Sequence, residues 1–184
     1  MTGSNLVTLL GDRLEDSTHA RFTNVEKINA LNQAQDFVVS TLPLEKLRLL
    51  ESTVIISGIT GGVTSVSNLS ILRDHLVSVQ NDTSGNTDHG TIIHHEQREV
   101  TSSYVAPCYL LGTDLYIPDY WTSIKLTFLQ EPNDIGDNSA LLPLTDMHYN
   151  IVLDMAESIL WNTDNKPQRA QYAEQRAAAQ LQTI

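Results

Sequence analysis

The sequence predicts an α+β fold, in which a helical bundle of N-terminal helices and a C-terminal helix pair carries an inserted antiparallel β module. Apolar residues recur every three or four positions near both ends of the chain, which is helical spacing. The middle of the chain instead holds β-branched and alternating segments, which are typical of strands. We expect one domain over residues 1–184, divided into N-terminal helices at 1–50, a β-rich insertion at 51–132 and the helix pair at 143–184.

Two helices are predicted in the N-terminal part. Residues 5–15 place three apolar side chains on one helical face, namely Val7, Leu10 and Leu14. Thr23 and Glu26 have the spacing of a capping box, which begins a second helix. That helix is expected to end at Leu42-Pro43, and residues 44–50 fit either a further helical turn or a lead into a sheet. Its expected apolar face is Val25, Ile28, Leu31, Ala34 or Gln35, Val38 and Leu42.

The middle of the chain predicts strands and a hairpin. Gly112 suits the first position of a two-residue turn, because that position needs a positive φ. Ile124, Leu126 and Phe128 alternate and share one face of a strand. The predicted strands lie at 52–57, 71–80 and 123–128, with a hairpin at 108–118. Polar loops are expected at 58–62, 81–90 and 131–139, and residues 91–104 are weakly patterned.

The C-terminal third predicts two helices separated by a polar break at 162–167. The first helix, 144–161, has a broad apolar face of Met147, Ile151, Met155 and Ile159, flanked by Leu144, Val152 and Leu160. The second, 168–181, has a thin stripe of Ala170, Ala173, Ala177, Leu181 and Ile184. Because alanines bury little apolar area, this helix either packs closely on a neighbour, docks fully on a partner, or frays at its end.

Charge and cysteine content argue against several functional classes of protein. The net charge is −11, and the 11 basic residues form no stripe, which argues against a conventional DNA-binding surface. An acidic chain favours solubility, a basic partner, or a wall that repels nucleic acid. A single cysteine excludes an internal disulfide and suggests a reducing cytoplasm. No apolar run approaches the roughly 20 residues of a membrane span, and the N-terminus does not resemble a signal peptide, so no membrane association is expected.

No catalytic, cofactor or metal site is predicted. Residues 57–62 are glycine-rich but lack both nucleotide-binding patterns, so we interpret them as a turn. His89, His94, His95 and Glu96 form one suggestive cluster, but adjacent histidines diverge on a strand or a helix, so we expect exposed loop histidines. Cys108 lacks a local activating group and is expected to be a buried apolar residue. The aromatic side chains of the β region favour a core or a protein interface, namely Tyr104, Tyr109, Tyr116, Tyr120, Trp121 and Phe128.

The ordered pattern resembles the head–tail adaptor (connector) proteins of tailed bacteriophages. The most telling local match is Leu31-Asn-Gln-Ala-Gln35 within the helix from Val25 to Phe37. The β insert resembles the family at Pro107-Cys-Tyr-Leu-Leu-Gly-Thr-Asp-Leu-Tyr-Ile-Pro118. Further similar segments are Ile124-Lys-Leu-Thr-Phe128, Pro132, His148 to Trp161, and Pro167-Gln-Arg-Ala-Gln-Tyr172. The likeness spans roughly residues 5–181, and the long loops at 81–90 and 131–139 depart from it.

The resemblance implies a non-enzymatic structural protein of the virion. Such adaptors form homo-oligomeric rings, commonly dodecamers, at the capsid–tail junction, and they assemble in the host cytoplasm. Their partners are the phage portal protein and a tail or nozzle protein, and DNA passes through the channel without specific binding during ejection. The portal-binding residues implied here are Arg169, Tyr172, Arg176 and Leu181.

Two alternative functions remain open from the sequence. The first is a tail completion or terminator protein, which would also be a virion component. The second is a metal-dependent hydrolase that uses His89, His94 or His95. Ring symmetry would separate the first alternative from an adaptor, and metal analysis would test the second.

Overall fold

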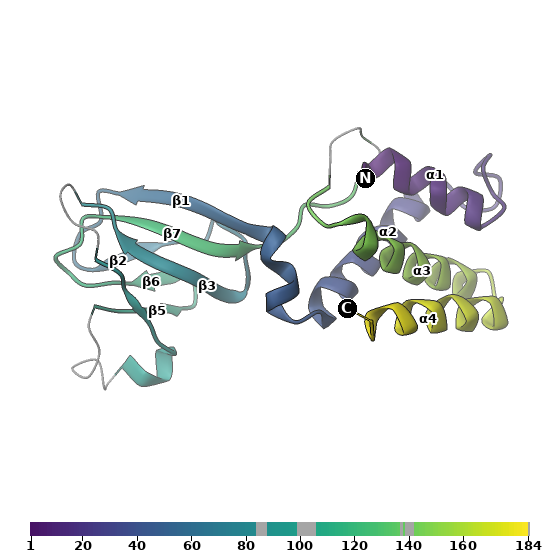
Figure 1. The fold of residues 1–184 in the computed structure, drawn as a ribbon. Coiled ribbons are helices and arrows are strands. Elements are labelled where there is room, and N and C mark those ends of the chain that lie inside the picture. The colour runs from purple at the N-terminus through teal and green to yellow at the C-terminus, as the bar shows by residue number, and fades with distance from the viewer. Residues whose placement is uncertain (84–87, 99–105, 137, 139–141, 184) are drawn as a thin grey trace. The chain divides into compact units, whose positions relative to one another are not determined.

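The computed structural model describes residues 1–83, 88–98, 106–136, 138 and 142–183. The chain separates into two compact units. The helical unit comprises Met1–Leu49 and Pro132–Ile184, and the β unit comprises Leu50–Glu131. The predicted α+β class, with a β module inserted between helical segments, is confirmed (Figure 1). Whether the two units act as one domain stays a prediction, and each unit is described by itself.

Helix α2 begins at the predicted capping residue Thr23, whereas helix α1 lies two residues before its predicted span of 5–15. In α2 (Asn24–Thr41), the Thr23 hydroxyl accepts the Glu26 N–H at 3.2 Å, and Glu26 Oε2 accepts the Thr23 N–H at 2.7 Å. This confirms the capping box. Thr2 caps α1 (Gly3–Arg13). Leu42 ends α2, and the ambiguous segment that follows Pro43 forms the 3₁₀-helix η1 (Leu44–Leu50).

The buried face of α2 differs from the predicted one. Val25 was expected to be buried but is 65% exposed, and the fully buried Lys27 lies inside instead. The burial of Gln35 is satisfied by hydrogen bonds, because its Nε2 donates to the Asn133 carbonyl at 3.1 Å and its Oε1 accepts from Tyr149 Oη at 3.3 Å. Apolar periodicity therefore predicted the position of the helix in the chain correctly. It did not predict that the buried face includes the polar residues Lys27 and Gln35 in place of Val25.

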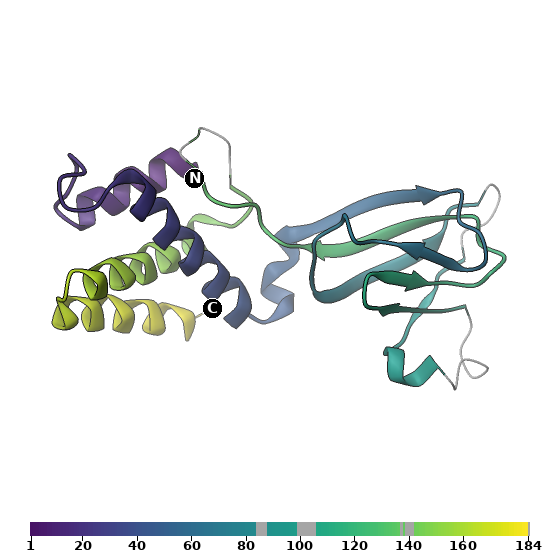
Figure 2. The same cartoon turned by 180° about the vertical axis from the view of Figure 1, so that it is seen from behind.

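Helix α3 (Asp146–Thr163) is the centre of the helical unit and packs against α1, α2 and α4 (Figure 2). It is buried on most sides, including its polar residues Asp154, Glu157 and Ser158. Met147 was predicted on the apolar face, but it lies in the first turn of α3 and is 50% exposed. The prediction of a one-sided amphipathic helix was wrong here, because neighbouring helices cover more than one side.

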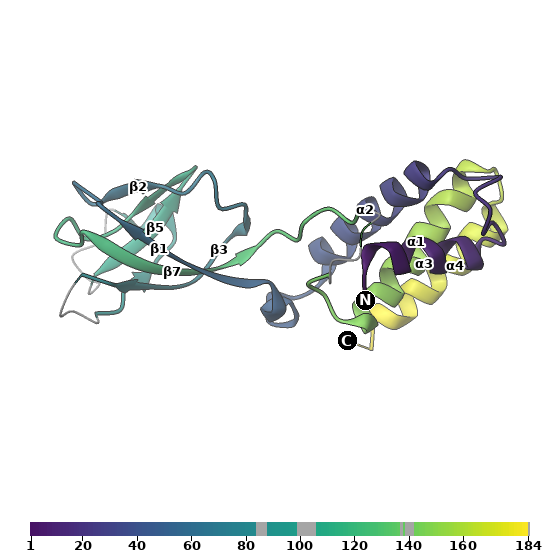
Figure 3. The same ribbon diagram turned by 90° about the horizontal axis from the view of Figure 1, so that it is seen from above.

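Helix α4 (Pro167–Leu181) lies beside α3 in both views (Figures 1 and 3). Ala170, Ala173 and Ala177 are at most 2% exposed, and their small side chains allow the two helices to approach closely. Of the three possibilities for this segment, close packing on a neighbour is therefore the one observed for its alanine stripe. Leu181 is half-buried, and Ile184 lies outside the described residues.

The β unit contains two sheets over one core. The first has the order β1-β7-β3, and the second has the order β2-β6-β5-β4. All pairs are antiparallel except β4 with β5. The strands are β1 (Glu51–Ser57), β2 (Val63–Ser65), β3 (Ile71–Asn81), β4 (Thr91–Ile92), β5 (Pro107–Leu111), β6 (Asp114–Tyr116) and β7 (Ser123–Gln130).

The predicted hairpin and strand faces are confirmed in the β unit. Leu111 pairs with Asp114 around a two-residue turn, and Gly112 has the positive φ, +61°, that such a turn needs. The shared core contains residues of both sheets, among them Leu76, Cys108, Leu115, Trp121, Ile124, Leu126 and Phe128. Trp121 and Phe128 are core residues as expected, whereas Tyr120 is 63% exposed.

Some predicted features lie outside the described residues. These are residues 84–87 of the loop at 81–90, residues 99–104 of the weakly patterned segment with Tyr104, and residues 137 and 139 of the loop at 131–139. Among the helices that the structure describes, none has the length and apolar character needed to cross a bilayer.

Candidate functional site

The helical unit contains a group of ionic side chains in which the carboxylates are buried and the arginines are partly exposed. Asp154 on α3 is 3% exposed, and its Oδ1 lies 2.5 Å from Arg13 Nη1 and 3.0 Å from Arg176 Nη2. Its other oxygen accepts from Gln180 Nε2 at 2.7 Å. Arg176 also pairs with Glu157, one turn further along α3. Because these donors come from α1 and α4, the cluster ties both helices to α3 through charge-assisted hydrogen bonds.

Trp161 extends this cluster towards the end of α3. Its ring is 2% exposed, and its Nε1 donates to Glu157 Oε1 at 3.3 Å. The guanidinium carbon of Arg169 lies 4.7 Å from the ring centroid, and that of Arg21 lies 5.3 Å from it. Phe22 meets the same ring edge-on at 6.1 Å between centroids. Two cations therefore lie over one buried indole, which attracts them through its quadrupole.

A cleft of about 310 Å³ opens beside this indole. Tyr172 is 64% exposed, and the Arg176 guanidinium lies 5.2 Å from its ring centroid. Arg169 is exposed, and within the described ranges no carboxylate oxygen lies within 4 Å of its guanidinium nitrogens. The cleft is lined by Arg13, Glu157, Trp161, Gln168, Arg169 and Tyr172. Its exposed part offers an aromatic ring and a cation, which are side chains enriched at protein interfaces.

The four predicted portal-binding residues have different environments. Arg169 and Tyr172 line the cleft together. Arg176 is engaged by Asp154 and Glu157 and serves the packing of α4 on α3. Leu181 is half-buried near the end of α4 and does not line the cleft. Their role in portal binding stays a prediction.

Sequence reasoning missed the residues that hold this site in place. Arg13, Asp154, Glu157 and Trp161 were not among its candidates. A usable signal was present in α3, where Asp154 and Glu157 lie three positions apart within an otherwise largely apolar stretch. Buried carboxylates need partners, so this spacing could have indicated an ionic contact with another helix.

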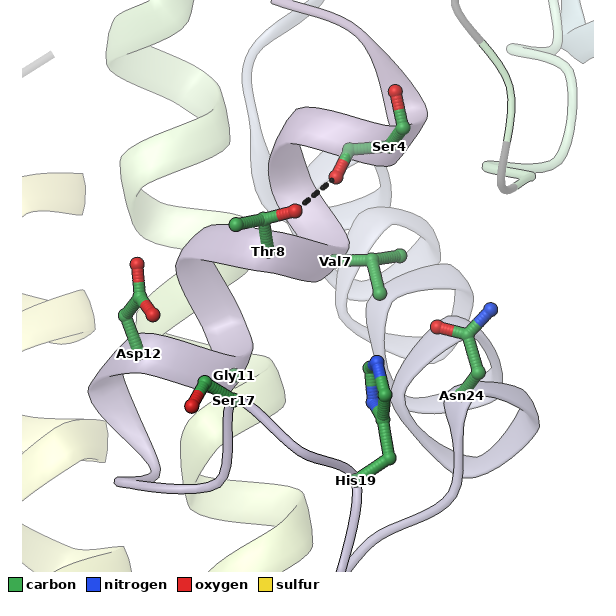
Figure 4. Close-up of a pocket in the computed structure, with 8 residues that line it drawn as sticks. All are labelled: Ser4, Val7, Thr8, Gly11, Asp12, Ser17, His19 and Asn24. Carbon is green, nitrogen blue, oxygen red and sulfur yellow. Dashed lines mark hydrogen bonds between the residues drawn. The ribbon is translucent and has the colours of Figure 1, made fainter.

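A second cavity, of about 330 Å³, lies between α1 and the segment before α2 (Figure 4). Its lining is mainly polar, and Thr8 Oγ1 donates to the Ser4 carbonyl at 2.9 Å along α1. The lining residues are Ser4, Val7, Thr8, Gly11, Asp12, Ser17, His19 and Asn24. Lys27, whose ammonium is buried next to the lining residue Gly11, already has polar partners.

Lys27 holds the connection between α1 and α2. Its ammonium lies 3.0 Å from Asp16 Oδ2, 2.6 Å from the Asp16 carbonyl and 3.0 Å from His19 Nδ1. Asp16 also accepts the backbone N–H groups of Arg21 and Phe22 at 2.9 Å each. Burial by itself raises the pKa of Asp16, but these N–H groups and the Lys27 ammonium outweigh it and hold that pKa well below its ordinary value. The cluster therefore has a structural explanation.

The histidine cluster lies in the β unit and is more compact than predicted. The ligand atoms of His94, His95 and Glu96 lie within 4.8 Å of one another. His89 lies apart from this group, in a bridge with Gln80. The expectation that adjacent histidines diverge was wrong, because His94 follows the end of β4 and His95 begins a short 3₁₀ turn over residues 95–98. His94 and Glu96 are exposed as predicted, and His95 is half-buried.

Cys108 has the predicted character of a buried apolar residue. Its side chain is fully buried, and this burial raises the pKa of the thiol to about 12. Its Sγ lies 3.6 Å from the Ala106 carbonyl oxygen. The thiol therefore remains protonated at neutral pH, and a protonated thiol is a poor nucleophile.

Comparison with protein-family models finds no matching family, and comparison with curated proteins finds no matching relative.

Proposed function

We propose that this chain is a ring-forming head–tail adaptor that binds a phage portal protein and links the capsid to the tail. The proposal assigns it a structural role at the capsid–tail junction, with a channel through which DNA passes. The tail or nozzle protein would be its other partner. Among the alternatives, a tail terminator differs mainly in ring symmetry and in its partner.

The main support for this proposal is that α4 exposes a cation and an aromatic ring next to each other. Buried alanines fix this helix on α3, so it presents Arg169 and Tyr172 from a rigid support. A rigid aromatic residue next to a cation loses little conformational entropy on binding. We expect these two side chains to contact an acidic or aromatic group of the portal protein.

Two further properties support the same function. The net charge of −11 suits a channel wall, because repulsion between like charges keeps DNA from adhering. The division into a helical unit and a β unit offers separate surfaces, and a closed ring requires two different surfaces on each subunit.

The test is mass photometry of the full chain alone and mixed with the portal protein encoded in the same genome. We expect a complex whose added mass corresponds to a ring of 20.4 kDa chains. The double variant Arg169→Gln/Tyr172→Ala should weaken this complex by about tenfold or more. Gln171→Ala, at an exposed position of the same helix, is the matched control and should bind normally.

The outcome separates the proposed function from its alternatives. A wild-type chain that never binds the portal refutes the adaptor assignment. Sixfold rings on tail tubes would identify a terminator instead. If the portal complex forms but the double variant binds normally, the adaptor role stands and the assignment of α4 as the portal-binding helix is wrong.

A further inference from the structure

A group of metal-ligating side chains lies in the β unit. His94 Nδ1 is 3.6 Å from Glu96 Oε2. The rings of His94 and His95 lie with their centroids 4.4 Å apart and their planes inclined by 38°. One ligand atom from each of the three residues fits within a span of 4.8 Å.

The local backbone explains why three consecutive residues converge. Ile93 is buried, and its N–H donates to the Cys108 carbonyl at 2.9 Å, which fixes the end of β4 against β5. Beyond this point the chain turns, and the Gln97 N–H donates to the His94 carbonyl at 2.8 Å. The Gln97 side chain closes the same turn by accepting the His94 N–H at 3.3 Å. In a turn of this kind the side chains no longer alternate between the two faces of a strand.

A cavity of about 370 Å³ adjoins both histidines. It has a mixed lining, in which Asp74 supplies a carboxylate and Leu76, Leu110 and Ile93 supply apolar walls. The volume exceeds what a metal ion and a coordinated water need, since one water occupies about 30 Å³ in the liquid.

The separations suit a small transition-metal ion. Zinc binds imidazole nitrogen at about 2.0–2.1 Å and carboxylate oxygen at about 2.0–2.2 Å, so ligand atoms around a tetrahedral ion lie roughly 3.4 Å apart. His94 Nδ1 and Glu96 Oε2, at 3.6 Å, are already close to that separation. His94 Nδ1 also accepts the Glu96 N–H at 3.5 Å, and a metal ion bound at Nδ1 would replace this long contact. The remaining adjustment, on the order of 1 Å, is accessible because the side chains of His94 and Glu96 are 62% and 78% exposed.

We propose that His94, His95 and Glu96 bind one divalent transition-metal ion, such as Zn²⁺, Ni²⁺ or Co²⁺, at the mouth of this cavity. Two imidazoles select such ions over Mg²⁺ and Ca²⁺, which prefer oxygen ligands. Three protein ligands leave a coordination position of the ion open, as in sites where zinc retains a water molecule. The site depends only on the β unit and is independent of the proposed adaptor role.

Isothermal titration of the full chain, after treatment with EDTA and dialysis, tests the site with Zn²⁺, Ni²⁺ and Mg²⁺ chlorides. We expect one Zn²⁺ or Ni²⁺ ion per chain and no saturable binding of Mg²⁺. His94→Ala and His95→Ala should each weaken Zn²⁺ binding by at least about tenfold. His89→Ala is the matched control, because His89 is an exposed histidine of the same unit outside the cluster.

A loss of metal binding is informative only if the variants remain folded. Far-UV circular dichroism of each variant should match the wild type, because His94 is exposed, His95 is half-buried, and neither ring belongs to the core. The proposal is overturned if the wild type binds neither Zn²⁺ nor Ni²⁺, or if His94→Ala and His95→Ala bind as tightly as His89→Ala. Neither result bears on portal binding, which involves the other unit.

Discussion

Replacement of Lys27 by methionine tests whether a buried ion pair holds the N-terminal helices together. Methionine keeps most of the apolar stem and removes the ammonium. The ammonium is completely buried and the Asp16 carboxylate is 4% exposed, so the variant leaves a buried anion without its cation. Removing one partner of a buried pair costs about 3–5 kcal/mol.

The structure places the expected loss at the lower end of that range. Asp16 keeps the two backbone N–H donors of Arg21 and Phe22, so its charge remains partly compensated in the variant. The Asp16 carbonyl and His19 lose their Lys27 partner as well. We therefore expect a loss of about 3 kcal/mol in the free energy of unfolding of the helical unit.

Urea unfolding followed by circular dichroism at 222 nm measures this loss. A change of about 3 kcal/mol corresponds to a shift of the midpoint on the order of 2 M, for a slope between about 1 and 2 kcal/mol per molar urea. Lys46→Met, at an exposed position of the same unit, should change stability by no more than about 0.5 kcal/mol. If the two variants differ by less than about 1 kcal/mol, the reasoning about the buried pair is refuted.

Three further predictions concern acid stability, a glycine turn and the cysteine. The pKa of Asp16 is lowered on folding from the value of 3.8, so its contribution to stability is complete above that pH and is lost progressively as the pH falls below it. Urea unfolding measured at several pH values from about pH 5 down to about pH 2 should show this loss, and Lys27→Met should show less of it. Gly62→Ala should destabilise the β unit by about 1–3 kcal/mol more than Gly61→Ala, as measured by thermal unfolding in a Trp161→Phe background, in which the fluorescence comes from Trp121 of the β unit. Both glycines have φ near +70°, but only a Cβ at Gly62 would come within 2.7 Å of a backbone oxygen; equal losses would contradict this steric explanation. Cys108, with its thiol pKa raised to about 12, should react with Ellman's reagent at pH 8 only after unfolding in urea, and rapid labelling of the native chain would show that the thiol is accessible.

The sequence predicted the elements of the helical unit better than the environment of their side chains. The capping box at Thr23 depends on contacts only three residues apart, so it could be inferred locally. The exposure of Val25 and Met147 could not be inferred in this way, because burial depends on which neighbours cover each face of the helix. The burial of Lys27 could not be inferred locally either. Its partner Asp16 lies in the connection between α1 and α2, and the two residues meet only because this connection folds back on α2.

The candidate sites show a similar division. Arg169 and Tyr172 were inferred from the sequence and do line one cleft. The partners that position this cleft, Arg13 and Asp154, are 141 residues apart in the chain. No local pattern relates residues at that separation. His94 and His95 were rejected as a pair from the geometry of regular strands and helices, whereas the turn after β4 brings them together.

The amino-acid sequence by itself determined the α+β class, the order of helices and strands, the capped start of α2 and the glycine turn of the hairpin. These features follow from hydrogen bonds and apolar spacing within a few residues. Only the tertiary structure decided which polar groups are buried, which carboxylate meets which guanidinium, and which exposed side chains converge. Those contacts join residues that are distant in the chain or that lie in irregular turns. In such turns the spacing of residues does not predict which way a side chain points.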